Sequence, residues 1–455
     1  MNLEKIHSVC FLGIGGIGMS AIARYFIASG KEVFGYDKTE SSITKSLIAQ
    51  GAEITYVDDE TWIKKHLKNV DQSSFLVVYT PAIPKNLKIK SILESTGIAL
   101  NKRSVVLGWI TQNTHNLSVA GTHGKTTTST LLSHILSHSG IPHVAFLGGI
   151  SSNYNSNYYC SDEVSDSMVS VTEADEFDRS FLTLKPKAAV ITSVDADHLD
   201  IYGAHDTMVE GFQEFAQLVE DQSKLIVQQE LQTLFDESAL TYGIEAGKMS
   251  ARHVHVNNGN FVFDLYAGND VHRNMVLPLP GEHNIENALA AGALAMSVGV
   301  NADQLRNAYA SFKGVKRRFE FIVRNEDCVY IDDYAHHPSE IKAAIKATRQ
   351  LYPDRKITAI FQPHLFSRTR DFMTDFAAEL SKVDELILLD IYPAREEPLE
   401  GINSARLMEE IACPCHLLER DSVLKFVSVH KPEVLLTLGA GDIDRIVEPL
   451  KSILS

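Results

Sequence analysis

The sequence predicts an α/β protein of three domains, each built on a parallel sheet. The chain has 455 residues, which suggests three domains at about 150 residues each. Apolar stretches that end in glycine or polar turns alternate with stretches of helical spacing, a pattern typical of strand–helix–strand units. Several strands are apolar throughout, which indicates parallel sheets covered on both faces. We expect the domains to span residues 1–104, 105–313 and 314–455.

The first segment predicts a Rossmann-like sheet with a glycine-rich turn. An apolar strand over residues 7–12 runs into GIGGIG at 13–18, and the helix that follows stops near Gly30. A second strand, over 32–37, ends at Asp37, 19 residues after Gly18, and a further strand begins at Leu76. Glycines at such a turn let backbone N–H groups approach a diphosphate at a helix N-terminus. The candidate residues are Gly15, Gly16, Ile17, Gly18 and Asp37.

The glycine motif by itself does not select a ligand. NAD, FAD and a UDP-sugar all carry a diphosphate, and a tight turn without a ligand is the fourth interpretation. An NAD-dependent oxidoreductase is therefore one functional hypothesis, and it rests on this turn alone.

The second segment predicts a shortened phosphate-binding loop. A strand over 117–120 leads into GTHGKTTT, and a helix over 126–137 closes at Gly140. The standard loop is G-x-x-x-x-G-K-[ST], but Val119 stands where its first glycine would be, and the first glycine is Gly121. Lys125 can reach the β- and γ-phosphates, and Thr126 is placed for Mg²⁺. The alternative is a chance Gly-Lys-Thr at a helix start. The motif favours a central P-loop ATPase-type α/β domain.

Acidic residues follow two further strands of this segment. Strands over 168–172 and 188–194 run into EADEFD, which begins at Glu173, and DADHLD, which contains His198. The carboxyl ends of parallel strands share one edge, where ligands bind, so we expect Glu173, His198 and the Lys125 loop to converge. The alternative for an acidic run is a solvated loop. Farther on, a helix over 284–298 carries Asn284 and Asn287 on one face, although Asn284 could simply cap it.

The third segment predicts a Rossmann-like C-terminal domain. Strands over 328–333, 357–363, 386–393 and 434–441 are apolar and end in polar or glycine-containing loops, and residues 339–352 have helical spacing. DDYAHHP follows the first strand, and two histidines beside two aspartates could bind either a metal or a ribose and a substrate. Arg317 and Arg318 precede it, and adjacent arginines are more often a solvated face.

Composition excludes several classes of protein. The formal net charge is −16, which argues against a nucleic-acid-binding surface. The longest apolar run, residues 288–300, is too short to span a bilayer, and the N-terminus does not resemble a signal peptide. Five scattered cysteines suit reduced thiols. We therefore expect a cytoplasmic protein, and we expect the polar stretch 151–167 to form a loop.

Taken together, the motifs resemble the Mur ligases, ATP-dependent amide ligases of peptidoglycan synthesis. The resemblance rests on GIGGIGMS, GTHGKTTT, EADEFD, DADHLD, HNIENALAA, KRRFE, DDYAHHP, QPHLFSRTRD and YPAREEP, which occur in this order over nearly the whole chain. It implies a UDP-binding, an ATP-binding and a closing C-terminal domain. It also implies that ATP phosphorylates the carboxylate of UDP-N-acetylmuramate and that L-alanine attacks the acyl phosphate. The implied cofactor is Mg²⁺, and the expected assembly is a monomer or weak homodimer.

The resemblance also assigns residues. It implies that Lys125 clamps the γ-phosphate, that Thr126, Glu173 and His198 contact Mg²⁺, and that residues 15–18 hold the UDP diphosphate. The larger sets that it implies are, for ATP, Gly121, Thr122, His123, Gly124, Lys125, Thr126, Thr127, Asn284, Asn287, Arg318 and Asp333, and, for L-alanine, Tyr334, His336, His364 and Arg368.

Two positions depart from the family pattern. Several family members have a carbamylated lysine about 15 residues after the metal histidine, but Gln213 stands there, and no lysine occurs between Lys187 and Lys224. Leu365 stands where a basic residue usually follows the histidine of the QPH motif, so the amino-acid carboxylate depends more on Arg368. The alternatives are a family member that attaches a recycled tripeptide to the same sugar nucleotide, and a non-catalytic sugar-nucleotide sensor.

Overall fold

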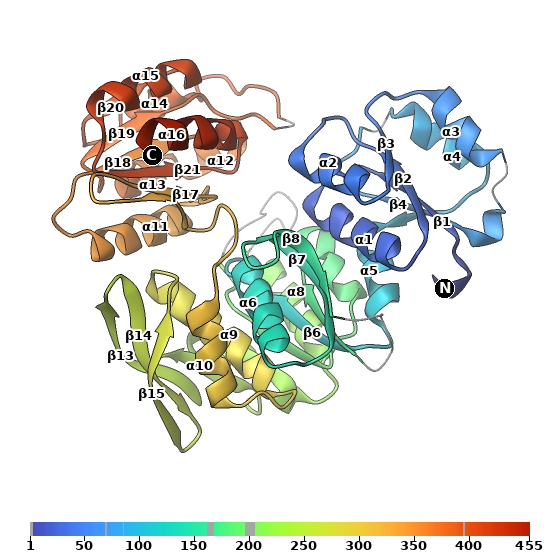
Figure 1. The fold of residues 1–455 in the computed structure, drawn as a ribbon, viewed down its shortest axis with the longest axis horizontal. Helices are drawn as coiled ribbons and strands as arrows, with labels where there is room; N and C mark the ends of the chain where they lie inside the picture. The colour runs from blue at the N-terminus through green and yellow to red at the C-terminus, as the bar shows by residue number, and fades with distance from the viewer. Residues whose placement is uncertain (1–2, 69–70, 85, 162–167, 196–204, 395) are drawn as a thin grey trace. The chain divides into compact units, whose positions relative to one another are not determined.

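The computed structural model describes residues 3–68, 71–84, 86–161, 168–195, 205–394 and 396–455 (Figure 1). The chain divides into two compact units, each of α/β structure. The first unit comprises Met1–Arg252, Asp264–Met275 and Glu286–Phe312, and the second comprises His253–Phe263, Val276–Ile285 and Lys313–Ser455. The predicted α/β class is confirmed, whereas the predicted boundaries after residues 104 and 313 stay predictions.

The N-terminal sheet, in the first unit, has the strand order β3-β2-β1-β4-β5, and all its strand pairs are parallel. Its middle strands are apolar and buried, as the sequence predicts. The strands are β1 (Ser8–Leu12), β2 (Glu32–Tyr36), β3 (Glu53–Thr55), β4 (Phe75–Tyr79) and β5 (Leu100–Lys102). The helices are α1 (Ile17–Ala28), α2 (Ser42–Ala49), α3 (Glu60–Leu67), α4 (Lys88–Ser95) and α5 (Arg103–Thr111), with short 3₁₀ turns at Leu3–Lys5 and Gln72–Ser74.

The central sheet has ten strands within the described residues, in the order β15-β14-β13-β12-β11-β10-β6-β9-β7-β8. The strands are β6 (His115–Ala120), β7 (His143–Ser151), β8 (Ser156–Cys160), β9 (Val169–Glu173), β10 (Ala188–Ile191), β11 (Leu225–Gln228), β12 (Leu240–Ile244), β13 (Met249–Asn257), β14 (Asn260–Ala267) and β15 (Asp270–Leu277). The helices are α6 (Lys125–His138), α8 (His205–Gln217), α9 (Glu282–Met296) and α10 (Ala302–Ser311), with 3₁₀ turns η3 (Phe177–Thr183), η4 (Gln222–Lys224) and η5 (Gln229–Leu234).

The C-terminal sheet, in the second unit, has the order β16-β17-β21-β18-β19-β20. Only its edge strand β16 is antiparallel to its neighbour. The strands are β16 (Glu320–Arg324), β17 (Val329–Asp333), β18 (Ile357–Phe361), β19 (Glu385–Leu388), β20 (Cys415–Leu417) and β21 (Val434–Leu438). The helices are α11 (Pro338–Leu351), α12 (Phe366–Asp371), α13 (Met373–Leu380), α14 (Ser404–Met408), α15 (Arg420–His430) and α16 (Val447–Leu454), with the 3₁₀ turn η6 (Asp442–Ile446).

One local prediction was wrong. Part of the expected loop 151–167 is the edge strand β8, and residues 162–167 lie outside the described part of the chain. The polar residue Asn157 of this strand is fully buried against α1. Its Nδ2 donates to Ile17 O (2.6 Å), and its Oδ1 accepts from Arg24 Nε (3.1 Å), so a polar side chain is needed at this buried position. The helix predicted over 284–298 is confirmed and runs from Glu282 to Met296.

A buried polar network sets the alignment of β6 with β9. Asn116 Nδ2 donates to Ser170 Oγ (2.9 Å) and Thr172 Oγ1 (3.1 Å), and Ser118 Oγ donates to Asn116 Oδ1 (2.6 Å). All four side chains are 0% exposed. Because a shift of one residue would leave these buried groups unpaired, the network opposes any slip of the two strands.

We expect Asn116→Leu to destabilise the fold by about 2–3 kcal/mol, because the hydroxyls of Ser170 and Thr172 lose a buried donor and Ser118 loses its acceptor. The measurement is the urea unfolding midpoint. Asn257→Leu, on an exposed residue at the end of β13, is the matched control, with an expected change of about 0.5 kcal/mol or less. Equal effects of the two substitutions would contradict a role for the network.

Candidate functional site

The phosphate-loop sequence lies between two neighbouring strands of the central sheet. β6 pairs in parallel with β10 on one side and β9 on the other. The residues after β10 hold the loop: Thr122 N donates to Ser193 O (3.0 Å), and His123 N donates to Ser193 Oγ (2.8 Å). Gly121 and Gly124 have φ of 130° and 81°, values that favour glycine. The loop therefore reaches α6 in a conformation that its glycines permit.

Neighbouring side chains leave no room for a Cβ at either glycine. A Cβ at Gly121 would collide with Thr192 Oγ1, and one at Gly124 with Asn287 Oδ1. Asn287 comes from α9 and also accepts from Thr128 Oγ1 (3.1 Å). The structure thus brings the predicted residue Asn287 to the loop. Thr127, also predicted, lies next to Thr128 in α6 and is buried.

The acidic turn after β9 provides the partners of the loop. Glu173 lies opposite Val119 in the β6–β9 register, so its carboxylate is at the edge where the loop begins. Thr126 Oγ1 donates to both Glu173 oxygens, at 3.0 and 3.2 Å. A Cβ at Gly148 of β7 would overlap the same carboxylate. The alternative of a solvated loop therefore does not describe Glu173, which ends a strand that lies between β6 and β7.

Lys125 is tied to the same turn. Its Nζ donates to Gly121 O (2.5 Å) and Thr122 O (3.3 Å), and it lies 2.9 and 2.8 Å from the two carboxylate oxygens of Glu176. Burial disfavours the charged ammonium, but the carboxylates of Glu176 and its neighbours outweigh burial and raise the pKa of Lys125. Lys125 is therefore a charged donor at neutral pH. The sequence analysis did not single out Glu176.

Two other acidic residues of this turn pair with the start of α5. Asp175 Oδ2 accepts from Arg103 Nη2 (3.1 Å), and Asp178 Oδ2 accepts from Lys102 Nζ (2.6 Å). The charges of EADEFD are thus distributed over separate partners, and only Glu173 and Glu176 are directed to the phosphate loop. This division depends on tertiary contacts between residues about 70 positions apart.

The oxygen donors at the loop fit a magnesium ion. Mg²⁺ prefers oxygen ligands and is usually held by one or two carboxylates together with substrate phosphates; the Thr126 hydroxyl and the Glu173 carboxylate lie within hydrogen-bond distance of each other. Within the described residues, no three His, Cys, Asp or Glu side chains form a metal-binding group. The predicted ligand His198 lies outside the described residues.

The N-terminal glycine turn is closed by the predicted residue Asp37. Asp37 Oδ2 accepts from Gly15 N (2.7 Å), and Gly16 is the N-cap of α1 without a side-chain cap. The first residues of α1, Ile17 and Gly18, therefore supply the helix N-terminus where an anion is favoured. A Cβ at Gly18 would collide with Arg103 Nη1, so this guanidinium lies against the first turn of α1. Arg103 was not among the residues predicted from the sequence, although the adjacent basic residues Lys102 and Arg103, where β5 ends and α5 begins, are a signal that could have indicated it.

The predicted nucleotide residues of the second unit surround the end of β17. Asp333 Oδ2 accepts from Phe319 N and Oδ1 from Ala335 N, both at 2.7 Å. Burial raises the pKa of Asp333 to about 6, against the opposing effect of Arg318. Arg318 lies over the Tyr334 ring at 5.1 Å. The alternative that Asn284 caps its helix is wrong, because α9 begins at Glu282 and Asn284 Nδ2 donates to Pro280 O (2.7 Å).

Three of the four residues expected for the amino acid form one aromatic group. The rings of Tyr334 and His336 are 5.3 Å apart, and those of His336 and His364 are 6.0 Å apart. Glu340 holds His336, accepting from His336 N at 2.9 Å. Arg368 lies in α12 and is half-buried. Leu365, which departs from the family pattern, has φ of 73° at the start of α12.

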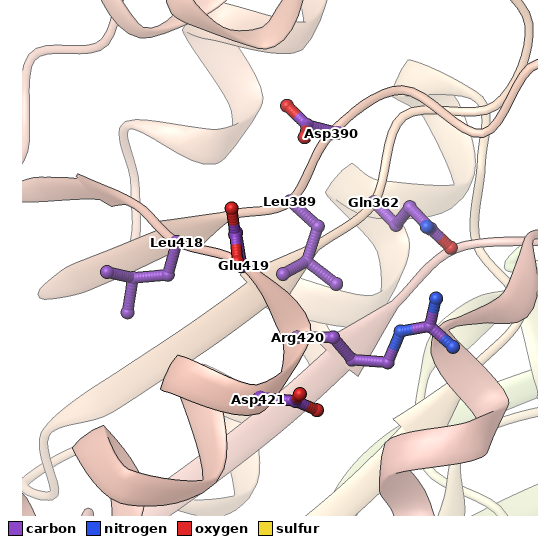
Figure 2. A pocket seen from close by; sticks show the side chains of 7 residues that line it. All are labelled: Gln362, Leu389, Asp390, Leu418, Glu419, Arg420 and Asp421. Carbon is purple, nitrogen blue, oxygen red and sulfur yellow. The ribbon is translucent and has the colours of Figure 1, made fainter.

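A pocket of about 370 Å³ in the second unit is lined by other residues (Figure 2). It lies where β18, β19 and β20 end and α15 begins, and its lining is Gln362, Leu389, Asp390, Leu418, Glu419, Arg420 and Asp421. Arg420 pairs with Asp442 (2.8 Å), and Gln362 Nε2 donates to the same carboxylate (2.9 Å). The pocket contains none of the predicted site residues.

Three family models match consecutive parts of the chain. They are described as "Mur ligase family, catalytic domain" over residues 8–115, "Mur ligase middle domain" over 119–295, and "Mur ligase, glutamate ligase domain" over 317–441. The chain belongs to the Mur ligase family. The phosphate loop and its acidic turn both fall in the Mur ligase middle domain.

Relatives of known name agree with this family. The UDP-N-acetylmuramate–L-alanine ligase of Flavobacterium johnsoniae is 46% identical over 456 residues, covering 100% of this chain and 99% of that protein. The crystal structure of the UDP-N-acetylmuramate-alanine ligase of Thermotoga maritima matches with a TM-score of 0.82 at 26% identity, over 98% of both chains. A murein peptide ligase of Psychrobacter arcticus matches with a TM-score of 0.72 at 23% identity over 98% of both chains, a likeness that shows the Mur ligase fold.

We expect Gly148→Ala to lower ligase turnover by at least about tenfold, because the added methyl group displaces the Glu173 carboxylate. The measurement is turnover in a coupled ADP-release assay, with a melting temperature to show that the variant is folded. Gly243→Ala, in β12 of the same sheet, is the control, because a Cβ there meets its nearest atom at 3.4 Å. Full turnover in Gly148→Ala would show that Glu173 does not need its present position.

Proposed function

We propose that this Mur ligase joins L-alanine to the carboxylate of UDP-N-acetylmuramate with ATP, in peptidoglycan precursor synthesis. The observation that carries the proposal is the loop at β6, where a charged lysine, a threonine hydroxyl and a carboxylate meet at one sheet edge. This set suits phosphoryl transfer, which needs positioned cations and charge neutralisation. The match to L-alanine ligases over the whole chain supports the choice of substrates.

The reaction proceeds in two steps. A carboxylate oxygen of the muramate attacks the γ-phosphorus of ATP, the bond to the β–γ bridging oxygen breaks, and ADP leaves. The amine of L-alanine then attacks the acyl carbon, and phosphate departs from the tetrahedral intermediate as the amine loses a proton. Lys125 binds the transferring phosphoryl group, and Thr126 with Glu173 would hold Mg²⁺, which would supply charge neutralisation at the phosphates. His198 would add a ligand to that ion.

The sugar nucleotide binds at the N-terminus of α1. The first turn of α1 offers the backbone N–H groups of Ile17 and Gly18 to the diphosphate, whereas the N–H groups of Gly15 and Gly16, also predicted for this site, are bonded within the turn to Asp37 Oδ2 and Gly13 O. Arg103 adds a guanidinium beside Gly18, and its ion pair with Asp175 keeps it there. Asp37 shapes the turn through its bond to Gly15 N. Backbone N–H groups at a helix N-terminus together with a guanidinium suit a diphosphate better than a neutral ligand.

L-Alanine binds at the aromatic group of the second unit. Tyr334, His336 and His364 provide a small pocket wall, and Arg368 holds the amino-acid carboxylate. The nucleotide-binding residues that we propose in the same unit are Arg318 and Asp333, and those that we propose on α9 are Asn284 and Asn287. We further propose that the enzyme is cytoplasmic and is a monomer or a weak homodimer. No helix among the described residues is long and apolar enough to cross a membrane.

Two alternative functions would require different substrates. A ligase that attaches a recycled tripeptide uses the same sugar nucleotide, and an NAD-dependent oxidoreductase uses the glycine turn alone and leaves the Lys125 loop without a role. The experiment is ADP release with UDP-N-acetylmuramate, Mg²⁺ and a panel of L-alanine, glycine, L-serine and the tripeptide. Release that requires L-alanine supports the proposal. Release with the tripeptide alone, or NAD binding without ATP turnover, would overturn it.

We expect Arg368→Ala to raise the KM for L-alanine by one to two orders of magnitude, because a guanidinium holds a carboxylate through two parallel hydrogen bonds. This corresponds to roughly 1.4–2.8 kcal/mol. Acyl-phosphate formation should survive, which borohydride trapping can measure. A variant that keeps its KM for L-alanine but loses acyl-phosphate formation would place Arg368 in the nucleotide site.

We expect the KM for ATP to rise as the pH falls through about 6, because the pKa of Asp333 is about 6 and protonation removes a charged acceptor for the nucleotide. The carboxylate form is present above that pH, so binding is strongest there. The measurement is the KM for ATP between pH 5 and 8 in the wild type and in Asp333→Asn. An identical pH profile in the variant would assign the effect to another group.

A further inference from the structure

The carboxylate of Glu176 has a fixed place beside the phosphate loop. Its side chain is only 1% exposed. The turn that carries it is joined to β6 through Ala174 N, which donates to Val119 O (2.8 Å), and to α5 through Asp175 Oδ2, which accepts from Arg103 Nη2 (3.1 Å). Of the two members of the ion pair, Glu176 is therefore the immobile one.

Lys125 is the member that can move. Its four-carbon side chain ends in three N–H donors, and Gly121 O, Thr122 O and the Glu176 carboxylate take them all. An ammonium has no further hydrogen to offer. A phosphate group that binds Lys125 must therefore replace one of these partners. The backbone carbonyls belong to the loop itself, so the Glu176 carboxylate is the partner most directly in competition with a nucleotide phosphate.

We propose that Glu176 is a positioning residue that holds Lys125 while the site lacks nucleotide and releases it to the phosphate when nucleotide binds. This inference rests on the proposed use of ATP and deepens it. Glu176 compensates the buried charge of Lys125 in the free enzyme, where an unpaired ammonium would be costly. It also opposes nucleotide binding, because it competes with the phosphates for the lysine. Its effect is to weaken nucleotide affinity and to speed ADP release.

The decisive substitution is Glu176→Gln, which keeps the shape of the side chain and removes its charge. We expect the Kd for ADP in the presence of Mg²⁺, measured by calorimetry on the full chain, to fall by about 5- to 20-fold, a coupling in the usual range for linked equilibria. ADP dissociation should slow in stopped-flow measurements. The free variant should melt at a lower temperature than the wild type, and ADP should raise its melting temperature by more. Glu176→Asp, which shortens the carboxylate by one methylene, should give an intermediate affinity.

Asp178→Asn is the matched control. Asp178 lies in the same turn, pairs with Lys102 on the surface, and has φ of 54°, a conformation that asparagine tolerates well. The substitution removes the same charge without touching Lys125, so its ADP affinity should equal that of the wild type. A second control is Lys125→Met, in which the added Glu176→Gln change should no longer tighten ADP binding by more than about twofold.

The possible outcomes distinguish a failure of the proposed use of ATP from a failure of the proposed role of Glu176. Wild-type enzyme that fails to bind ADP with Mg²⁺ would overturn the proposed use of ATP. Wild-type enzyme that binds ADP, together with a folded Glu176→Gln variant of unchanged or weaker affinity, would overturn the role of Glu176 alone. An equal gain in Asp178→Asn, or an undiminished gain in the Lys125→Met background, would also overturn it, because the effect would then be general charge rather than release of the lysine.

Discussion

The alignment of β6 with β9 is the constraint on which the candidate site depends. Parallel pairing places Glu173 opposite Val119, at the point where the phosphate loop leaves the sheet. The buried hydrogen bonds of Asn116 with Ser170 and Thr172 hold that register. Because successive side chains of a strand point to opposite faces, a slip of one residue would turn Glu173 away from Thr126. The hydrogen bonds of Thr126 with Glu173 and the ion pair of Lys125 with Glu176 both depend on this one alignment.

Because the formal net charge is −16, the proposed phosphate ligands would be attracted by individual cationic side chains and backbone N–H groups rather than by the charge of the whole protein. The two cations nearest the proposed phosphate positions, Lys125 and Arg103, each have a carboxylate partner in the acidic turn. The carboxylate of Glu176 keeps Lys125 charged although it is buried. In the proposed function, nucleotide affinity depends on exchange between this internal carboxylate and the ligand phosphates, rather than on an attractive field over the whole surface.

The second unit organises its residues around the end of another parallel strand, β17. Asp333 bonds two backbone N–H groups there, and the chain then turns through Tyr334 and His336 into α11. The aromatic contacts with His364 bring in the end of β18. Both units therefore use the rule that ligand-binding residues follow the carboxyl ends of parallel strands. The acidic pocket beside α15 lies at other strand ends of the same sheet and has its arginine already paired.

Motifs with a local physical basis were predictable from the sequence. The glycines of the two turns, Lys125 and Thr126 at a helix start, and Glu173 and Asp333 at strand ends are marked by short-range patterns, and the apolar strands predicted the α/β class. Other features were not predictable, because they depend on which distant segments meet. The strand β8 was missed because its polar sequence is explained only by the contact of Asn157 with α1. Arg103 and Glu176 gain their roles from partners 72 and 51 positions away, a pairing that no local pattern encodes.

The sequence by itself determined which groups of the loop can bind phosphate and metal, since residue type and spacing decide that chemistry. The tertiary structure alone decided which carboxylate neutralises which cation, because ion pairing depends on distance in space and burial.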